Sequence, residues 1–143
     1  MEKCIDASVA LKWVINGEPY RRRALKLLHD ATRLGVILIA PPMYEYEVES
    51  VLQSRFLHKK TTLTEVDASL AFLEKVGVQL ITMPTLVKRA REIARQYNQP
   101  QIYDSLYAAL AELRACEFWT ADKRFYDAVK GELPFVNYLA HYK

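Results

Sequence analysis

The stretch Val36-Ile37-Leu38-Ile39-Ala40, ended by Pro41-Pro42, decides the fold class of this chain. Five consecutive apolar residues without polar alternation are typical of a strand buried on both faces of a parallel sheet. Shorter runs of the same character lie at residues 4–5, 78–81, 117–120 and 134–136. Helical patterns separate the runs, at residues 9–15, 18–34, 43–57, 64–77, 84–97, 103–115 and 123–130. We therefore expect an α/β fold, a three-layer α/β/α sandwich with a central parallel sheet of about five strands.

The helix expected at residues 64–77 has a signal at each end. Thr64 and Asp67 have the spacing of a capping box, with Asp where Glu is usual, so this helix is expected to begin at Thr64. Gly77 is the residue type that most often follows the last turn of a helix.

The length and composition are those of an ordinary globular domain. The 143 residues are 51% hydrophobic and 26% charged, without repeats or a flexible linker, so we expect a single domain over residues 1–143. Charged residues interrupt the first twelve positions, so we expect no signal peptide. No apolar run reaches 18 residues, so we expect no membrane span. Two isolated cysteines, Cys4 and Cys116, fit a reducing cytoplasm better than a disulfide framework or a zinc site. His29, His58 and His141 stand in charged or terminal settings, which indicates structural or surface roles.

Two aspartates follow predicted strands, at the edge where a parallel sheet binds its ligands. Asp6 comes directly after residues 4–5, and Asp122 comes two residues after 117–120. All strands of a parallel sheet end at the same edge, so the two carboxylates converge if their strands are neighbours. Each aspartate also precedes a predicted helix, so a simple N-cap role is the alternative.

Two further acidic positions lie in predicted helices. Asp104 opens a helix that is apolar nearly all round, where a buried carboxylate must be paired, neutralised or bound to metal. The alternative is a helix N-terminus that favours a negative charge. In the helix at residues 43–57, Glu45 and Glu47 flank the apolar face on opposite sides, and periodicity alone does not choose between them.

Four segments together resemble the PIN-domain family, and within it the VapC-like toxins of bacterial and archaeal toxin–antitoxin pairs. They are I-D-A-S-V-A-L-K-W at residues 5–13, A-P-P-x-x-x-x-E-V-x-x-V-L at 40–52, Y-D-S-L-Y-A-A-L-A-E at 103–112 and W-T-A-D-K-R-F at 119–125. Each segment alone is a modest signal. The four stand in the family's order and approximate spacing over nearly the whole chain, so the resemblance implies a PIN-like fold.

The resemblance also implies a set of site residues. The family's acidic quartet falls on Asp6, Glu47, Asp104 and Asp122. Glu47 is chosen over Glu45 because the family's glutamate precedes Val. Ser8 and Thr120 match positions that support the site. Ser50 is a departure, since the family often has Asn there, and it removes an expected supporting hydrogen bond.

Converging carboxylates without His or Cys form an all-oxygen site, which suits Mg²⁺ or Mn²⁺ rather than zinc. Such a cation relieves the repulsion between the carboxylates, lowers the pKa of bound water and neutralises charge on a phosphoryl oxygen. The resemblance implies a metal-dependent endoribonuclease that hydrolyses RNA phosphodiester bonds in unpaired regions. The four acids would be its catalytic and metal-binding residues.

An acidic site that cuts a polyanion needs basic surroundings. The net charge of +3 is uninformative, but setting the quartet aside leaves 13 acids against 20 Lys and Arg. Lys123 and Arg124 directly follow Asp122 and are the expected RNA phosphate contacts. Basic clusters at residues 21–26, 55–60 and 88–95 are interpreted first as solvated helix faces.

Two alternatives come from other functional classes. A PIN-like fold without catalysis would be an RNA- or protein-binding module, and the intact acidic quartet argues against it. A phosphatase of the haloacid dehalogenase type also places Asp after its first strand. Here Asp6-Ala7-Ser8 lacks the second Asp that such an enzyme uses.

The resemblance implies two protein partners. A toxin requires a cognate antitoxin protein that covers the acidic pocket, typically with a basic residue. The family also tends to form homodimers. Apolar residues expected to be exposed and available for a dimer are Leu63, Phe72, Tyr138, Leu139 and Tyr142.

Overall fold

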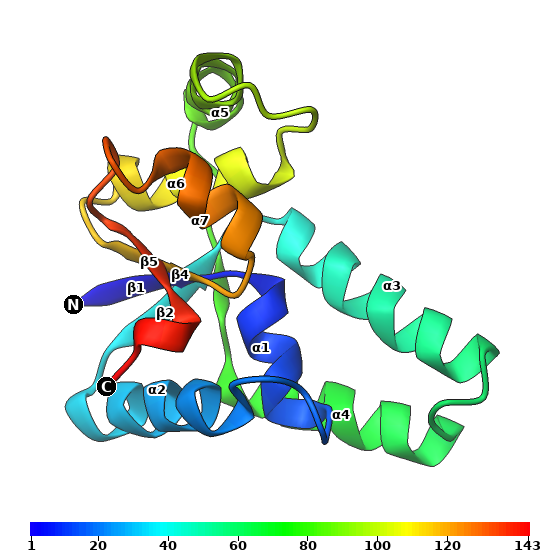
Figure 1. Ribbon diagram of the computed structural model, residues 1–143. Coiled ribbons are helices and arrows are strands. Elements are labelled where there is room, and N and C mark those ends of the chain that lie inside the picture. The colour runs from blue at the N-terminus through cyan, green and yellow to red at the C-terminus, as the bar shows by residue number, and fades with distance from the viewer.

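A five-stranded parallel sheet in the order β3-β2-β1-β4-β5 forms the centre of the molecule (Figure 1). The structure is a computed structural model that describes residues 1–143. The strands are β1 (Glu2–Ile5), β2 (Ile37–Ala40), β3 (Gln79–Leu80), β4 (Glu117–Thr120) and β5 (Val136–Tyr138). All four strand pairs are parallel, which confirms the predicted sheet. The chain builds β1 to β3 outward in one direction and then adds β4 and β5 on the other side of β1.

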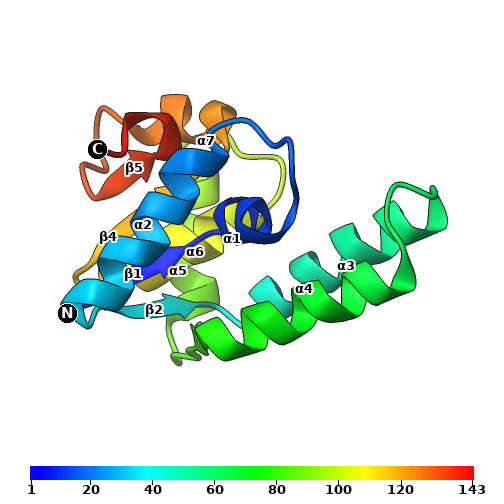
Figure 2. The same cartoon turned by 90° about the horizontal axis from the view of Figure 1, so that it is seen from below.

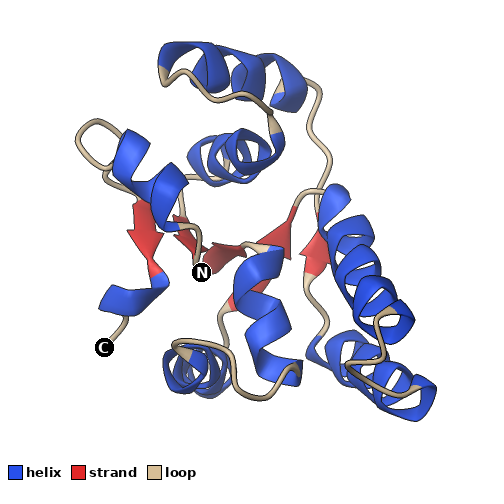
Figure 3. Cartoon of the chain, turned by 45° about the vertical axis from the view of Figure 1, so that its right-hand side comes forward, coloured by secondary structure: helices blue, strands red, loops and turns tan.

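Helices cover both faces of this sheet. They are α1 (Ala7–Val14), α2 (Arg21–Leu34), α3 (Met43–Leu57), α4 (Leu63–Val76), α5 (Leu86–Gln96), α6 (Tyr103–Leu113) and α7 (Lys123–Val129), followed by the 3₁₀ turn η1 (Leu139–His141). In Figures 1 and 3, α1 and α2 lie against one face and α6 and α7 against the other, with α5 packed on the outer side of α6. Helices α3 and α4 form a hairpin that extends away from the sheet (Figure 2). None of the helices combines the length and apolar character needed to cross a bilayer.

The core follows from strands that are buried on both faces. Ile5, Ile39 and Phe118, from three adjacent strands, are fully buried. Phe118 stacks on Tyr107 of α6, with ring centroids 5.6 Å apart. Burying such large side chains contributes about 1.5–3 kcal/mol each. The sheet is therefore a firm support for the loops at its edges.

The start of α4 differs from the prediction. The helix begins at Leu63, and Thr62 rather than Thr64 is its N-cap. The Thr62 hydroxyl accepts a hydrogen bond from the Glu65 amide at 3.2 Å and donates one to the Glu65 carboxylate at 3.0 Å. Thr62-x-x-Glu65 offers Glu at the third helical position, the favoured capping-box acid, so it prevails over Thr64-x-x-Asp67.

The end of the chain also differs from the prediction. Residues 133–136 form a turn closed by a hydrogen bond from the Val136 amide to the Leu133 carbonyl, so the last strand begins at Val136 and not at residue 134. As a result Tyr138 and Leu139 are buried, with exposed fractions of 9% and 0%. The prediction that they are exposed was wrong.

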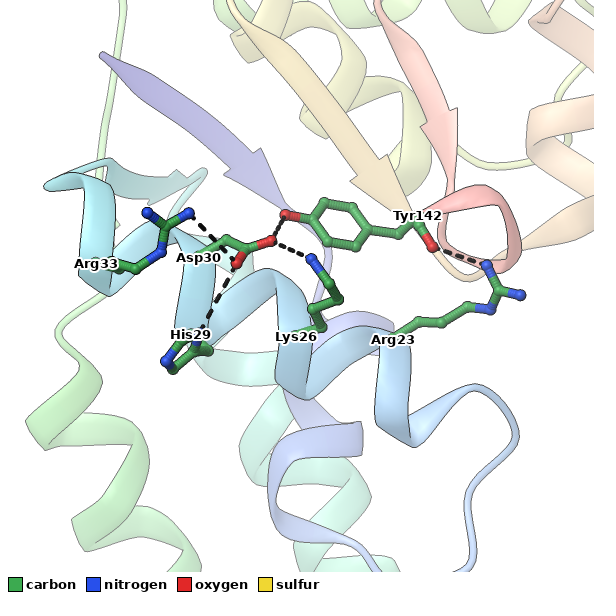
Figure 4. A network of polar contacts seen from close by, with 6 residues as sticks. All are labelled: Arg23, Lys26, His29, Asp30, Arg33 and Tyr142. Atoms are coloured by element: carbon green, nitrogen blue, oxygen red, sulfur yellow. Dashed lines mark hydrogen bonds and ion pairs between the residues drawn. The ribbon is translucent and has the colours of Figure 1, made fainter.

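Tyr142 is likewise held against the domain (Figure 4). Its hydroxyl donates to Asp30 on α2 at 2.8 Å, and its carbonyl accepts from Arg23 at 2.7 Å. Its ring meets that of Trp119 edge-on, with centroids 4.9 Å apart. Of the five predicted exposed apolar residues, Leu63 and Phe72 are exposed.

Candidate active site

The candidate site lies where the strand order reverses. β1 and β4 are neighbours, and their register pairs Ile5 with Trp119. Asp6 follows β1 directly, and its amide still donates to the Trp119 carbonyl at 3.1 Å. Connections leave β1 and β4 toward opposite halves of the sheet, which opens a crevice at their carboxyl ends. The topology therefore brings the loops that carry Asp6 and Asp122 side by side.

Asp6 is the buried centre of the site, with an exposed fraction of 3%. One carboxylate oxygen accepts from the Ser8 amide at 3.1 Å, which caps α1, and the other accepts from the Thr120 hydroxyl at 2.8 Å. Burial raises the pKa of Asp6 and the nearby Asp122 adds to the rise, while the bonds from Thr120 and Ser8 oppose it. Both oxygens are thus oriented by neutral donors.

Ser8 and Thr120 also tie the two loops together. The Ser8 hydroxyl accepts from the Ala121 amide at 3.1 Å, and the Thr120 hydroxyl accepts from the Asp122 amide at 3.0 Å. Asp122 in turn caps α7, accepting from the Phe125 amide at 3.1 Å. Asp6 and Asp122 therefore both serve as N-caps, the alternative that the sequence posed, and the charge of Asp122 also acts on Asp6.

Glu47 reaches the site through a residue that sequence reasoning missed. The Tyr107 hydroxyl donates to the Glu47 carboxylate at 2.8 Å and accepts from the Ala7 amide at 3.4 Å. Tyr107 thereby joins α3, α6 and the start of α1. The only sequence signal for it is that a tyrosine in an otherwise apolar helix needs a partner for its hydroxyl.

The structure separates Glu47 from Glu45. Glu47 is half-buried, and its pKa rises to about 7 because of burial and the charge on Asp6, although the bond from Tyr107 opposes the rise. Glu45 is exposed and lines a groove between α3 and α4 instead. Of the two glutamates that periodicity left open, Glu47 is the one that joins Asp6.

Asp104 stands in the first turn of α6 and completes the group of acids. Its pKa rises to about 8, first because of burial and then because of the charges on Asp6, Asp122 and Glu47. Asp104, Asp122 and Arg124 line one cavity of about 170 Å³. Asp104 therefore lies at the N-terminus of α6, within reach of the charges of the three other acids.

None of the four acids has a cationic partner within ion-pair distance. The ten ion pairs of the molecule all use other acids. Like-charged carboxylates in a partly buried crevice raise one another's pKa, and a divalent cation removes that repulsion.

The donor set fits an ion of the Mg²⁺ type in its chemistry. It offers carboxylate and hydroxyl oxygens, with no thiolate or imidazole. No three His, Cys, Asp or Glu side chains are grouped closely enough to enclose an ion by themselves. Mg²⁺ usually keeps several waters and takes only one or two carboxylates directly, so an open group of this kind suits it.

The basic residues differ in whether they lie beside the acids or bond to other parts of the fold. Arg124 lines the cavity that holds Asp104 and Asp122. Lys123, the other expected RNA contact, pairs with Asp127 at 2.6 Å. The basic clusters on α2 and α5 are partly structural, because Arg23 bonds to Tyr142 and Arg89 pairs with Glu112 at 2.9 Å.

Comparison with known proteins agrees with the fold described above. A protein-family model described as "PIN domain" matches residues 3–131. The crystal structure of PAE2754 from Pyrobaculum aerophilum is similar in fold, with a TM-score of 0.65 over 98% of this chain and 92% of that chain, at 19% sequence identity. A comparison with curated proteins finds no match. Because the family model covers most of the chain, this protein belongs to the PIN domain family.

Proposed function

We propose that this protein is a metal-dependent endoribonuclease that hydrolyses RNA phosphodiester bonds. PIN domains are generally nucleases and typically use divalent metals. The observation that carries the proposal is a set of four acids, Asp6, Glu47, Asp104 and Asp122, that lie close enough for their charges to act on one another and have no cationic partner. Buried, unpaired charge of this kind lowers stability, so a catalytic use explains its presence.

Each acid has a role that its surroundings favour. A bound Mg²⁺ or Mn²⁺ would supply a water of lowered pKa and neutralise charge on the phosphoryl group. Asp6, fixed by Thr120 and Ser8, and Asp104 and Asp122 beside it are the residues that would hold the ion, directly or through water. Glu47, held by the Tyr107 hydroxyl at 2.8 Å, would orient or deprotonate the attacking water. Arg124, on the same cavity, would contact an RNA phosphate.

The proposal extends to protein partners. An antitoxin that covers the crevice with a basic side chain would supply the counter-charge that the four acids lack. Leu63 and Phe72, with exposed fractions of 59% and 41%, are the remaining apolar candidates for a homodimer contact. Light scattering of the wild type and Leu63→Asp tests the dimer. To test the antitoxin, the wild type and the Asp104→Asn variant are each co-expressed with the product of a small neighbouring gene, and the two results are compared.

The test of the activity is cleavage of a mixed RNA pool with Mg²⁺ or Mn²⁺. We expect Asp104→Asn to lower the rate by about 100-fold or more, because it removes a charge that would hold the ion. Asp127→Asn is the matched control: it removes an acid from α7 that is already paired with Lys123 and Lys130, and it should cleave like the wild type. Equal cleavage by wild type and Asp104→Asn would refute the assignment. Chelator-resistant cleavage would refute the metal, and no cleavage by the wild type would favour a binding module.

A further inference from the structure

A second hollow adjoins the carboxylates on the side of α3. It has a volume of about 430 Å³ and is lined by Met43, Tyr46, Glu47, Ser50, Val51 and Tyr103. Its volume lies within the range of about 300–1,000 Å³ that is usual for small-ligand pockets. Glu47 belongs to the acidic group and Tyr103 directly precedes Asp104, so the hollow is continuous with the candidate active site.

Two tyrosines in this hollow are exposed and free of aromatic partners. Tyr46 and Tyr103 have exposed fractions of 71% and 53%. The tyrosines near the chain end behave differently, since Tyr138 and Tyr142 contact other rings. Tyr46 and Tyr103 take part in none of the ring contacts of the molecule. The hollow therefore offers two unused aromatic faces.

The two sides of Tyr103 differ in their charged groups. Tyr103 lines both the hollow and the cavity that contains Asp104, Asp122 and Arg124. On the side of that cavity, the Arg124 guanidinium is a cation available to a phosphate, next to two of the carboxylates that would hold the ion. On the hollow side, the only charged lining group is Glu47, a carboxylate that repels phosphate, and the rest is aromatic, aliphatic or hydroxyl. The base of a nucleotide, and not its phosphate, suits the hollow.

We propose that this hollow holds one unpaired base of the RNA strand, stacked on Tyr103 and bounded by Tyr46. The inference rests on the proposed function, because it assumes that the strand's phosphate lies at the carboxylates. Stacking on aromatic side chains is sequence-tolerant and requires a base that is out of its duplex. The hollow would therefore select unpaired RNA over duplex RNA.

The test measures binding and cleavage separately. A short single-stranded RNA with one 2-aminopurine is titrated with metal-free protein, and the quenching of its fluorescence reports stacking. We expect Tyr103→Ala to weaken binding by about fivefold to 150-fold, the range for the loss of one stacked base, and Tyr46→Ala to weaken it less. Tyr103→Phe keeps the ring and should bind like the wild type. Leu57→Ala, at the far end of α3 and 70% exposed, is the control for loss of an exposed apolar side chain.

A second arm uses the same strand with an abasic site in place of each nucleotide in turn, cleaved in Mn²⁺. One abasic position should slow the wild type and leave Tyr103→Ala unchanged. If Tyr103→Ala binds, quenches and cleaves like the wild type, the base site is refuted while the nuclease assignment stands. If the wild type does not cleave but shows Tyr103-dependent quenching, the nuclease assignment fails and the base site stands. Absence of both refutes both, and equal binding of duplex and single strand overturns the stated selectivity.

Discussion

Acidic residues at the two edges of the sheet differ in whether they pair with a cation. At the edge where the strands begin, Glu2 pairs with Arg114 at 2.7 Å and Glu117 pairs with Lys3 at 3.3 Å. At the edge where the strands end, Asp6, Glu47 and Asp122 accept from neutral hydrogen-bond donors, and none of the four acids pairs with a cation. The edge with paired acids also holds the larger cavity, about 680 Å³ against about 170 Å³. Unpaired charge, and not cavity size, therefore identifies the candidate site.

This difference has an energetic consequence. An exposed ion pair contributes little to stability, usually less than about 1 kcal/mol. A partly buried group of like charges lowers stability, since each carboxylate loses hydration and repels the next. Only the acids at the carboxyl ends of the strands therefore lower the stability of the fold. This is the pattern expected where function requires charged groups that the fold itself does not need.

Adding a divalent ion should produce the largest difference between the edges. A ligand at about 100 times its Kd stabilises the folded state by about 2.7 kcal/mol, which corresponds to a rise in Tm of about 8–11 °C here. We expect Mn²⁺ to raise the Tm of the wild type by such an amount and that of Asp6→Asn hardly at all. Thermal melting at increasing Mn²⁺ measures this.

Glu2→Gln is the control from the opposite edge, and its Tm should rise with Mn²⁺ as in the wild type. A similar rise in Asp6→Asn would place any bound ion outside the crevice.

The pH dependence of metal-free stability should be the next largest effect. The folded-state pKa values of Asp104 and Glu47 are raised to about 8 and about 7, whereas unfolded carboxyls titrate near 4. Between these limits the folded state binds more protons than the unfolded state, so stability falls as pH rises from about 4.5 to about 8. We therefore expect the stability of the metal-free protein to decrease steadily over this window.

Urea unfolding at several pH values in chelator measures the slope. The double variant Asp104→Asn, Glu47→Gln should have a flatter profile, and saturating Mn²⁺ should flatten that of the wild type. Stability of the metal-free wild type that rises over the same window would contradict the raised pKa values.

Single neutralising substitutions at the two edges should change stability in opposite directions. Asp104→Asn removes a repelling charge and should stabilise the metal-free protein at pH 8 by about 1 kcal/mol, or about 3–5 °C in Tm. Glu2→Gln breaks the pair with Arg114 and should lower Tm by about 1–2 °C. Melting curves in chelator compare them. A lower Tm for Asp104→Asn would mean that this acid is structural.

Most of the fold was predictable from the sequence because its signals are local. Continuous apolar runs predict buried strands, and 3.6-residue periodicity predicts the helices between them. The convergence of Asp6 and Asp122 followed from one topological rule about parallel strands. The choice of Glu47 over Glu45 did not follow from local pattern, because it depends on Tyr107, which lies 60 residues away in the chain.

The positions that were predicted wrongly or missed also depend on contacts between segments far apart in the chain. Tyr138 and Leu139 appeared free because they lie near the chain end, but Tyr138 is the last residue of β5 and Leu139 begins η1, and both are buried. Tyr107 appeared to be one more apolar position in a buried helix, although its hydroxyl links Glu47 to the Ala7 amide. Contacts between distant segments decide such positions, and a single sequence carries no direct record of them.

A further small effect concerns the contact between Tyr142 and α2 (Figure 4), where the Tyr142 ring also lies 5.6 Å from the Lys3 ammonium that pairs with Glu117. The Asp30 carboxylate accepts from Lys26 and from the Tyr142 hydroxyl, each at 2.8 Å, and these bonds lower the pKa of Asp30 to about 2. Tyr142→Phe removes one bond but keeps the ring on Trp119, so Tm should fall by about 1–3 °C with RNA cleavage unchanged. Tyr142→Ala, which also loses the ring contact, should lower Tm further. Melting and cleavage assays on both variants measure this, and a loss of cleavage in Tyr142→Phe would show that the chain end acts on the site through β4.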